Sequence, residues 1–363
     1  MIAHQLGETS RGGRLVIPLR FSIVEPVNLV EDNGDRKMHD RPLVSVIIPT
    51  YNRATVISET IDNVFSQTYK NIELIVVDDG STDDTPAILR RYADRVRTIT
   101  QKNAGPAAAR NRGIEVSGGD IIAFQDSDDL WEPSKLERQV ALLEKSGNSV
   151  PCCLCSASFG IVDGKPYTSF DISDIDSPYG EGLWLNVAEI LATRFVLFNQ
   201  TVAIRRWAIE KVGGFDASLK YLEDYDLPLR LAVEGPWAFI RDPLVIYREG
   251  TEHSFSKQAH RDPLALKDCE FTIFERLLEK VRNTGGNANL ERHLERRLKG
   301  YRRGLRIIKL EQSNSPTAQT IAKVGGVFER YYGAAFRRSP WLYPRALTVP
   351  IDCNGSQRNL SSL

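Results

Sequence analysis

Between residues 44 and 147, short β-branched runs alternate with segments whose apolar residues recur at helical spacing. The first run, VSVIIP at residues 44–49, is almost continuously apolar, which is typical of a strand buried on both faces of a sheet. We expect further strands at 72–79, 96–101 and 120–126, and helices at 54–67, 82–93, 105–117 and 132–147. This order predicts an α/β fold in which helices cover both faces of a mostly parallel, Rossmann-like sheet.

After residue 148 the alternation becomes less regular. Residues 162–182 are rich in Gly, Ser, Asp and Pro, which predicts a mobile loop. We expect a strand followed by a helix in 201–216, a short helix at 223–235 and two short strands in 237–249. Residues 264–311 keep one apolar face at helical spacing, which predicts a helical region.

The composition argues against several classes of protein. The 363 residues include 47 basic and 47 acidic side chains, so no overall charge favours a nucleic acid partner. The N-terminal residues lack the apolar segment of a secretory signal, and no stretch reaches the ~20 apolar residues of a membrane span. Three of the five cysteines lie in 152–155 without zinc-site spacing. We interpret them as free thiols in a reducing compartment and expect a cytoplasmic protein.

Three expected strands end in polar clusters, which are PTYNR, DDGSTDD and DSDD. Ligands of such sheets bind beyond the carboxyl ends of the strands, so the clusters should meet at one edge. Asp78 and Asp79 either form a surface turn or accept hydrogen bonds from a nucleobase or a ribose. DSDD, at 126–129, either caps the following helix or holds a hard divalent cation together with a diphosphate.

Three further features also have two interpretations each. Arg110 is either an ordinary surface residue of its helix or a cation near a diphosphate. The acids of EDYD, at 223–226, either stabilise a helix N-terminus or include a general base. His253 is either structural or completes the coordination of a metal or a diphosphate.

These segments, in this order, resemble the family 2 glycosyltransferases, which have the GT-A fold. The resemblance covers about residues 42–256 and rests on VSVIIPTYNR, VVDDGSTDD, NAGPAAARNRGI, GDIIAFQDSDDLW, VGGFD, EDYDLPLRLA and YREGTEHS. It implies a nucleotide-sugar donor, usually UDP-linked, a divalent cation (Mn²⁺ or Mg²⁺) and inversion at the anomeric carbon. Pro228 departs from the family, which often has a bulky residue at that position.

The resemblance also implies roles for individual residues. Asp224 matches the catalytic base, and Glu223 lies beside it on the acceptor side. Asp128 matches the metal-binding acid, and His253 matches a position that in some members helps to hold the metal or the diphosphate. The positions that match the nucleotide-sugar site are Thr50, Tyr51, Asp79, Arg110, Asp126 and Ser127.

We therefore expect a hexosyltransferase (EC 2.4) that adds one sugar to a glycan or lipid-linked acceptor, as in polysaccharide, lipopolysaccharide or other cell-surface glycan assembly. The Gln-x-x-Arg-Trp signature of processive members is missing, which favours transfer of a single sugar. One alternative is a non-catalytic sugar-nucleotide-binding or scaffold protein. Another is a sugar-phosphate nucleotidyltransferase, although PTYNRA lacks the Gly-rich phosphate loop that such an enzyme needs.

The C-terminal part lies outside the resemblance. Residues 291–310 contain eight Lys or Arg and two Glu beside an apolar face. They form either a solvated helix packed on the rest of the protein or a peripheral contact with an anionic membrane, at its inner face. We divide the chain into an N-terminal extension, a GT-A catalytic domain, a helical C-terminal region and an irregular tail, at 1–40, 41–260, 261–340 and 341–363.

Overall fold

The apolar run that begins at residue 44 forms β1 (Val44–Thr50), between β2 (Ile72–Asp78) and β4 (Ile121–Phe124) and parallel to both. β3 (Arg97–Thr100) extends this parallel part beyond β2. The predicted strands of the first 130 residues are therefore confirmed, within a few residues at their ends. The computed structural model describes residues 41–162, 164–194, 196–248, 262–285, 287–313, 315 and 348–349.

The other half of the sheet is mixed. β9 (Val202–Arg205) is antiparallel to β4 and to β6 (Cys152–Val162), and β10 (Trp237–Ile246) is parallel to β6. The order is β11-β8-β10-β6-β9-β4-β1-β2-β3, with β5 on β10 and β7 on β6. The remaining strands are β5 (Leu130–Trp131), β7 (Lys165–Thr168), β8 (Glu181–Trp184) and β11 (Thr348–Val349). The predicted α/β class is confirmed, with antiparallel pairs added in the second half.

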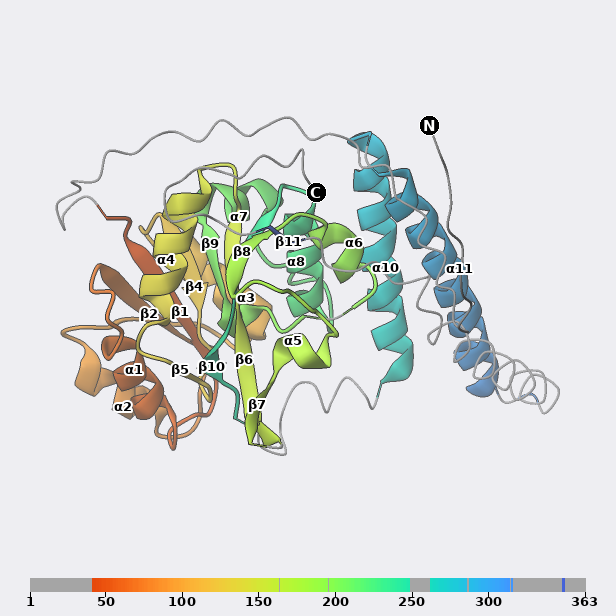
Figure 1. Cartoon of the computed structure of the whole chain (residues 1–363). Coiled ribbons are helices and arrows are strands. Elements are labelled where there is room, and N and C mark those ends of the chain that lie inside the picture. The colour runs from red at the N-terminus through yellow and green to blue at the C-terminus, as the bar shows by residue number, and fades with distance from the viewer. Residues whose placement is uncertain are drawn as a thin grey trace, which may run out of the picture.

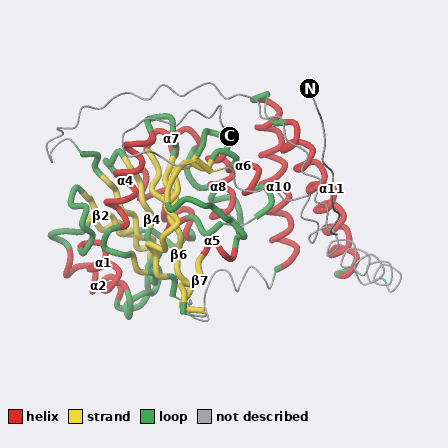
Figure 2. Tube along the Cα trace, in the orientation of Figure 1, coloured by secondary structure: helices red, strands yellow, loops and turns green. Residues whose placement is uncertain are grey.

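Helices cover both faces of the sheet (Figures 1 and 2). In β1, Val44, Val46 and Ile48 belong to one apolar cluster, whereas Ile47 belongs to the cluster on the opposite face. The helices are α1 (Ile57–Phe65), α2 (Thr85–Leu89), α3 (Pro106–Val116), α4 (Lys135–Ser146), α5 (Ser169–Ile172), α6 (Val187–Leu191), α7 (Arg206–Val212), α8 (Glu223–Ala232), α10 (Pro263–Asn283) and α11 (Ala288–Glu311), with 3₁₀ turns at Arg90–Tyr92 and Asn199–Thr201.

The helices α10 and α11 lie side by side at one end of the molecule, and α10 lies next to α8 (Figure 1). Phe274 of α10 stacks on Tyr301 of α11 and meets Tyr225 of α8 edge to face, with ring centroids 5.5 and 5.7 Å apart. Leu294 and Leu298 are buried in the same apolar cluster. The predicted helical region is thus confirmed, and its apolar face packs on the rest of the protein. In the described part of the chain, no helix is long and apolar enough to cross a membrane.

The mobile loop predicted at 162–182 is wrong for residues 165–172, whereas residues 173–180 contain no helix or strand. β7 pairs with β6, and α5 follows with a capping box in which Thr168 and Asp171 satisfy each other's backbone N–H groups. The polar residues of this segment form a paired strand and a helix cap, which composition alone does not predict.

The prediction of two short strands in 237–249 is also wrong. Residues 237–246 form one strand, β10. Its register against β6 shifts around Pro243, so the strand continues past the proline.

Close packing of α3 on β1 positions the site. A Cβ atom at Gly113 would collide with the side chain of Ile47, so only glycine permits this approach. Arg110 lies one helical turn earlier and is therefore on the same side of α3. Asn111 donates to the Phe215 carbonyl and accepts from the Phe215 N–H, both at 2.8 Å, which ties α3 to the turn after α7.

Candidate active site

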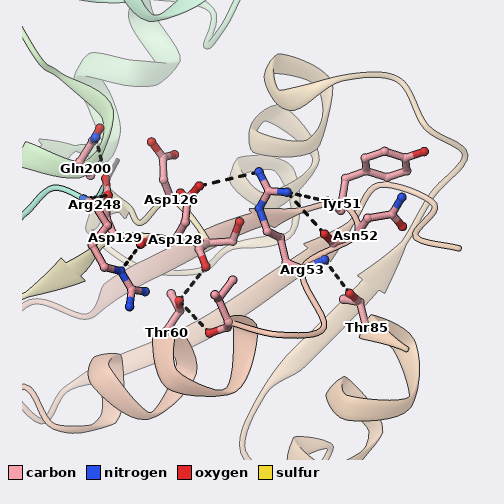
Figure 3. A network of polar contacts seen from close by, with 12 residues as sticks. Tyr51, Asn52, Arg53, Thr60, Thr85, Asp126, Asp128, Asp129, Gln200 and Arg248 are labelled. Carbon is pink, nitrogen blue, oxygen red and sulfur yellow. Dashed lines mark hydrogen bonds and ion pairs between the residues drawn. The ribbon is translucent and has the colours of Figure 1, made fainter. Parts of the chain in front are cut away.

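The three polar clusters do meet at one edge of the sheet. The backbone N–H of Asp79 donates to the Thr50 carbonyl at 2.8 Å, which joins the ends of β1 and β2. The loop after β1 then reaches the acids that follow β4 (Figure 3). Arg53 Nη2 lies 3.7 Å from Asp128 Oδ2. Sequence reasoning missed Arg53, although it stands at the end of PTYNR, one of the clusters that pointed to this edge.

Asp79 organises the loop that leads into α3. Its Oδ1 accepts from Gln101 Nε2 at 2.8 Å and from the Ala104 N–H at 2.9 Å, and its Oδ2 accepts from the Gly105 N–H at 2.8 Å. A carboxylate has about four acceptor positions, so capacity for one more donor remains. Asp79 can therefore hold the loop and still accept a hydrogen bond from a ligand.

Thr50 and Asp78 are neighbours in the register of β1 and β2. Thr50 Oγ1 and Asp78 Oδ2 are buried, and neither has a hydrogen-bond partner among the described residues. Tyr51, directly after Thr50, is 44% exposed. Buried polar atoms usually have partners, so this end of the sheet has unused hydrogen-bonding capacity beside an accessible aromatic ring.

The three acids of DSDD have different surroundings. Asp129 is buried and accepts from the Arg248 N–H and from Gln200 Nε2, both at 2.9 Å (Figure 3). Burial, reinforced by the charge of Asp126, raises the pKa of Asp129 to about 8. Asp129 therefore anchors the end of β10. Arg248, whose side chain also contacts the Asp128 carbonyl and Glu59, was likewise missed, although it lies in YREGTEHS, one of the segments that carry the resemblance.

Asp126 and Asp128 keep more exposed carboxylates. Asp126 accepts from Arg110 Nη2 at 2.8 Å, and Ser127 is buried with its carbonyl accepting from Thr60 Oγ1. Asp128 makes no hydrogen bond through its side chain to another described residue, and its ion pair with Arg53 is long. Burial and the Asp126 charge raise the pKa of Asp128, and Arg53 opposes this.

The two carboxylates fit part of a divalent cation site. Mg²⁺ and similar ions are usually held by one or two carboxylates together with phosphate oxygens, which matches Asp126 and Asp128. Within the described residues, no group of three or more His, Cys, Asp or Glu could hold a metal alone. His253, the other predicted metal ligand, lies outside the described residues.

The acids of EDYD are also distinct. α8 begins directly after Leu222, whose φ of 67° places a bulky residue in the left-handed region. Glu223 accepts from Arg110 Nη1 at 3.3 Å. Asp226 is buried and pairs with Arg230, at 2.8 Å to Nε and 2.6 Å to Nη2, and Arg230 donates to the Gly214 carbonyl. Asp226 thus holds α8 to the turn after α7.

Asp224 is the acid without a protein partner. Its carboxylate makes no hydrogen bond or ion pair to another described residue. Burial first, and the neighbouring Glu223 second, raise the pKa of Asp224 to about 7, while Arg110 opposes the rise. A half-buried carboxylate of this kind is suited to take a proton near neutral pH.

The chain is similar to known glycosyltransferases. The family model described as Glycosyl transferase family 2 matches residues 45–207. The Bacillus subtilis protein EpsE, whose name places it among glycosyltransferases, is 47% identical over 207 residues, 54% of this chain and 69% of EpsE. The chain belongs to glycosyl transferase family 2. A Rickettsia typhi protein also named as a glycosyltransferase is 37% identical over 186 residues, and the chain covers 57% of its length.

Two solved glycosyltransferase structures have the fold of this family 2 protein. Staphylococcus aureus TarS 1–349 in complex with UDP matches with a TM-score of 0.51 at 19% identity, over 71% of this chain and 70% of that one. The mannosyltransferase PcManGT of Pyrobaculum calidifontis, in complex with GDP-Man and Mn²⁺, also gives 0.51 at 19%, over 84% and 86%. These likenesses confirm the GT-A fold.

The roles of Asp226 and Asp224 can be distinguished by experiment, because Asp226 pairs with Arg230 and should contribute to stability. We expect Asp226→Asn to lower the free energy of unfolding by about 2 kcal/mol, because it weakens the charge-assisted pair that orients Arg230 toward the Gly214 carbonyl in the turn before α8. Chemical denaturation, with the mutant at the same pH and salt as the wild type, measures this. An unchanged unfolding midpoint would show that Asp226 is not a structural anchor.

Proposed function

We propose that this protein is an inverting glycosyltransferase that moves one sugar from a nucleotide-sugar to an acceptor hydroxyl, in cell-surface glycan assembly. The observation that carries the proposal is Asp224, a carboxylate with a raised pKa and no pairing partner among the described residues, directly beside Glu223, which shares the cation Arg110 with Asp126. Family membership supports the same class of reaction.

The donor in this proposal is a UDP-sugar. Thr50, Tyr51 and Asp79 line the nucleoside side, where unused acceptor capacity and an exposed ring suit a base and a ribose. Asp126 and Ser127 lie toward the sugar and the diphosphate. The complexes of TarS with UDP and of PcManGT with GDP-Man support a nucleotide-linked donor of this general kind.

In the proposed reaction, Asp224 accepts the proton of the acceptor hydroxyl as its oxygen attacks the anomeric carbon. The new carbon–oxygen bond forms on the face opposite the leaving group, while the bond from the anomeric carbon to the diphosphate oxygen breaks. One such displacement inverts the configuration. General-base catalysis of this kind typically contributes 10²–10⁴-fold. Glu223, held by Arg110, lies beside the base on the acceptor side.

Asp128, with His253 in the undescribed segment, would hold a divalent cation, Mn²⁺ or Mg²⁺. When bound, such an ion neutralises charge on the departing diphosphate. Arg53, whose Nη2 lies 3.7 Å from Asp128 Oδ2, places a permanent positive charge on the same side of the site.

A non-catalytic binder or a scaffold would have no use for an unpaired acid with a raised pKa, and burying one without function is costly. A nucleotidyltransferase would place a phosphate loop after β1. That position holds Tyr51, Asn52 and Arg53, and the Asn52 side chain is bonded to the Thr82 N–H at 2.8 Å. Sugar transfer is therefore the better proposal.

The first test is Asp224→Asn. The amide keeps the shape of the side chain but cannot accept the proton, so kcat should fall by roughly 10²–10⁴-fold while the KM for donor changes little. Transfer is measured with a panel of UDP-, GDP- and dTDP-sugars, and Asp226→Asn is the matched control that should keep kcat within about twofold. Normal transfer by Asp224→Asn would refute the assignment of the base.

The pH dependence follows from the same residue. Because the pKa of Asp224 is about 7, the base is mostly protonated below that pH and ionised above it. The kcat/KM of the wild type should rise about tenfold per pH unit below 7 and level off above it. Steady-state rates from pH 5.5 to 8.5, with circular dichroism to confirm the fold, measure this. A flat profile across that range would contradict the role.

The metal assignment is tested with Asp128→Ala. Loss of this carboxylate should abolish the part of donor binding that depends on Mn²⁺ or Mg²⁺, because few protein ligands would remain for the ion. Calorimetric titration of UDP with and without Mn²⁺ measures that difference. If Mn²⁺ strengthens UDP binding equally in mutant and wild type, Asp128 is not a ligand.

We also propose a peripheral contact of α11 with the inner face of the membrane, as a lipid-linked acceptor would require. Since Leu294 and Leu298 are buried, the contact is electrostatic. The exposed cations recur every three or four residues, at Arg292, Arg296, Lys299, Arg303 and Arg306.

Each basic residue near an anionic bilayer contributes about 1 kcal/mol. The protein should therefore float with anionic liposomes at low salt, and the double variant Lys299→Glu, Arg303→Glu should not. Lys145→Glu, an exposed lysine of α4, is the control that should float like the wild type. If the wild type does not float with anionic liposomes at low salt, the proposed membrane contact of α11 is wrong.

A further inference from the structure

Arg110 lies at the junction of the two acidic segments. Its side chain is 6% exposed, and it contacts two carboxylates that are far apart in the sequence. Nη2 donates to Asp126 at 2.8 Å, and Nη1 donates to Glu223 at 3.3 Å. Asn199, with its amide oxygen turned toward the guanidinium, accepts from both Nη atoms at 3.3 Å. The centroid of the Phe215 ring lies 5.4 Å from the guanidinium carbon.

These contacts use the terminal donors of the guanidinium. Arginine has five N–H groups, of which four are on the two Nη atoms. Protein acceptors face both Nη atoms, and Nε is buried without a partner among the described residues. A buried charge with fixed partners does not move freely, because breaking either pair would leave a carboxylate uncompensated. Arg110 is therefore directed at the protein, and a donor diphosphate would compete with these bonds.

The two partners belong to different sides of the site. Asp126 opens DSDD at the end of β4, two residues before Asp128. Glu223 is the first residue of α8, directly before Asp224. One side chain on α3 thus connects the donor side to the residue beside the base. Its anchor is firm, since α3 is packed on β1 at Gly113 and tied to Phe215 by Asn111.

We propose that Arg110 is a positioning residue that sets the distance between the bound donor and Asp224 through its simultaneous contacts with Asp126 and Glu223. The proposal rests on the proposed glycosyl transfer. In-line displacement requires the reacting atoms to be about 3–3.5 Å apart, and a shift of ~1 Å can cost about 10²-fold in rate. Arg110 acts through the two acids and does not itself contact the reacting atoms.

The test is Arg110→Lys, with Arg112→Lys as the matched control. Lysine keeps the charge but has one nitrogen in place of the planar fork, so it cannot keep both contacts in the same geometry. We expect kcat to fall about 10²-fold, with the KM for donor and the Kd for UDP within about threefold of wild type. Arg112, two residues along and 43% exposed, pairs only with Glu115 on the surface and should tolerate the change.

A double-mutant cycle examines the contact from its other end. Glu223→Gln keeps an acceptor oxygen but removes the charge, and it should also lower kcat. If Arg110 acts through Glu223, the double variant should lose much less than the product of the two single losses. Thermal unfolding of all four proteins shows whether each variant is folded. If Arg110→Lys does not fold, Glu223→Gln alone still tests the proposal, because an unchanged kcat in that variant would contradict it.

Each result decides the matter. Parental kcat in Arg110→Lys overturns the positioning role, as do strictly multiplicative losses in the cycle. A large loss of UDP binding with unchanged kcat would make Arg110 a donor ligand and also overturn it. A wild-type protein that transfers no sugar from any donor of the panel would instead refute the proposed function itself.

Discussion

Five carboxylates share one partly buried edge of this sheet, and their mutual repulsion is the constraint on which the site depends. They are Asp126, Asp128, Asp129, Glu223 and Asp224. Like charges so close together in a region of low dielectric can coexist only if cations, hydrogen bonds or protons offset them. Arg110 offsets Asp126 and Glu223, Arg53 lies near Asp128, and Asp129 accepts two hydrogen bonds.

This uneven distribution of partners gives each acid a different chemistry. Asp129 and Asp226 are buried and accept hydrogen bonds from protein groups, so they serve as anchors. Asp128, the proposed metal ligand, keeps a carboxylate without hydrogen bonds to other described residues. Asp224 has no protein partner among the described residues, so burial and Glu223 raise its pKa toward neutrality. Residues of one type thereby differ in function because their neighbours differ.

The scaffold explains why those neighbours are in place. The parallel strands β1, β2 and β4 bring three loops to one edge, as the strand order predicts. α3 then approaches β1 at a glycine and presents Arg110 to both halves of the site. α10 and α11 complete the apolar cluster behind α8, the helix that carries the proposed base in its first turn. These two helices therefore support the site from outside the family motifs.

The sequence by itself determined the α/β class, most strand and helix positions before residue 150, and the segments that supply the site. Those features follow from local periodicity and from the order of motifs along one chain. Only the tertiary structure decided which groups pair with each acid, since a pKa or a hydrogen-bond partner depends on groups far away in sequence. Arg53, Gln200 and Arg248 could not be assigned for that reason, and neither could the strand and helix in 165–172, where pairing with β6 outweighs a loop-like composition.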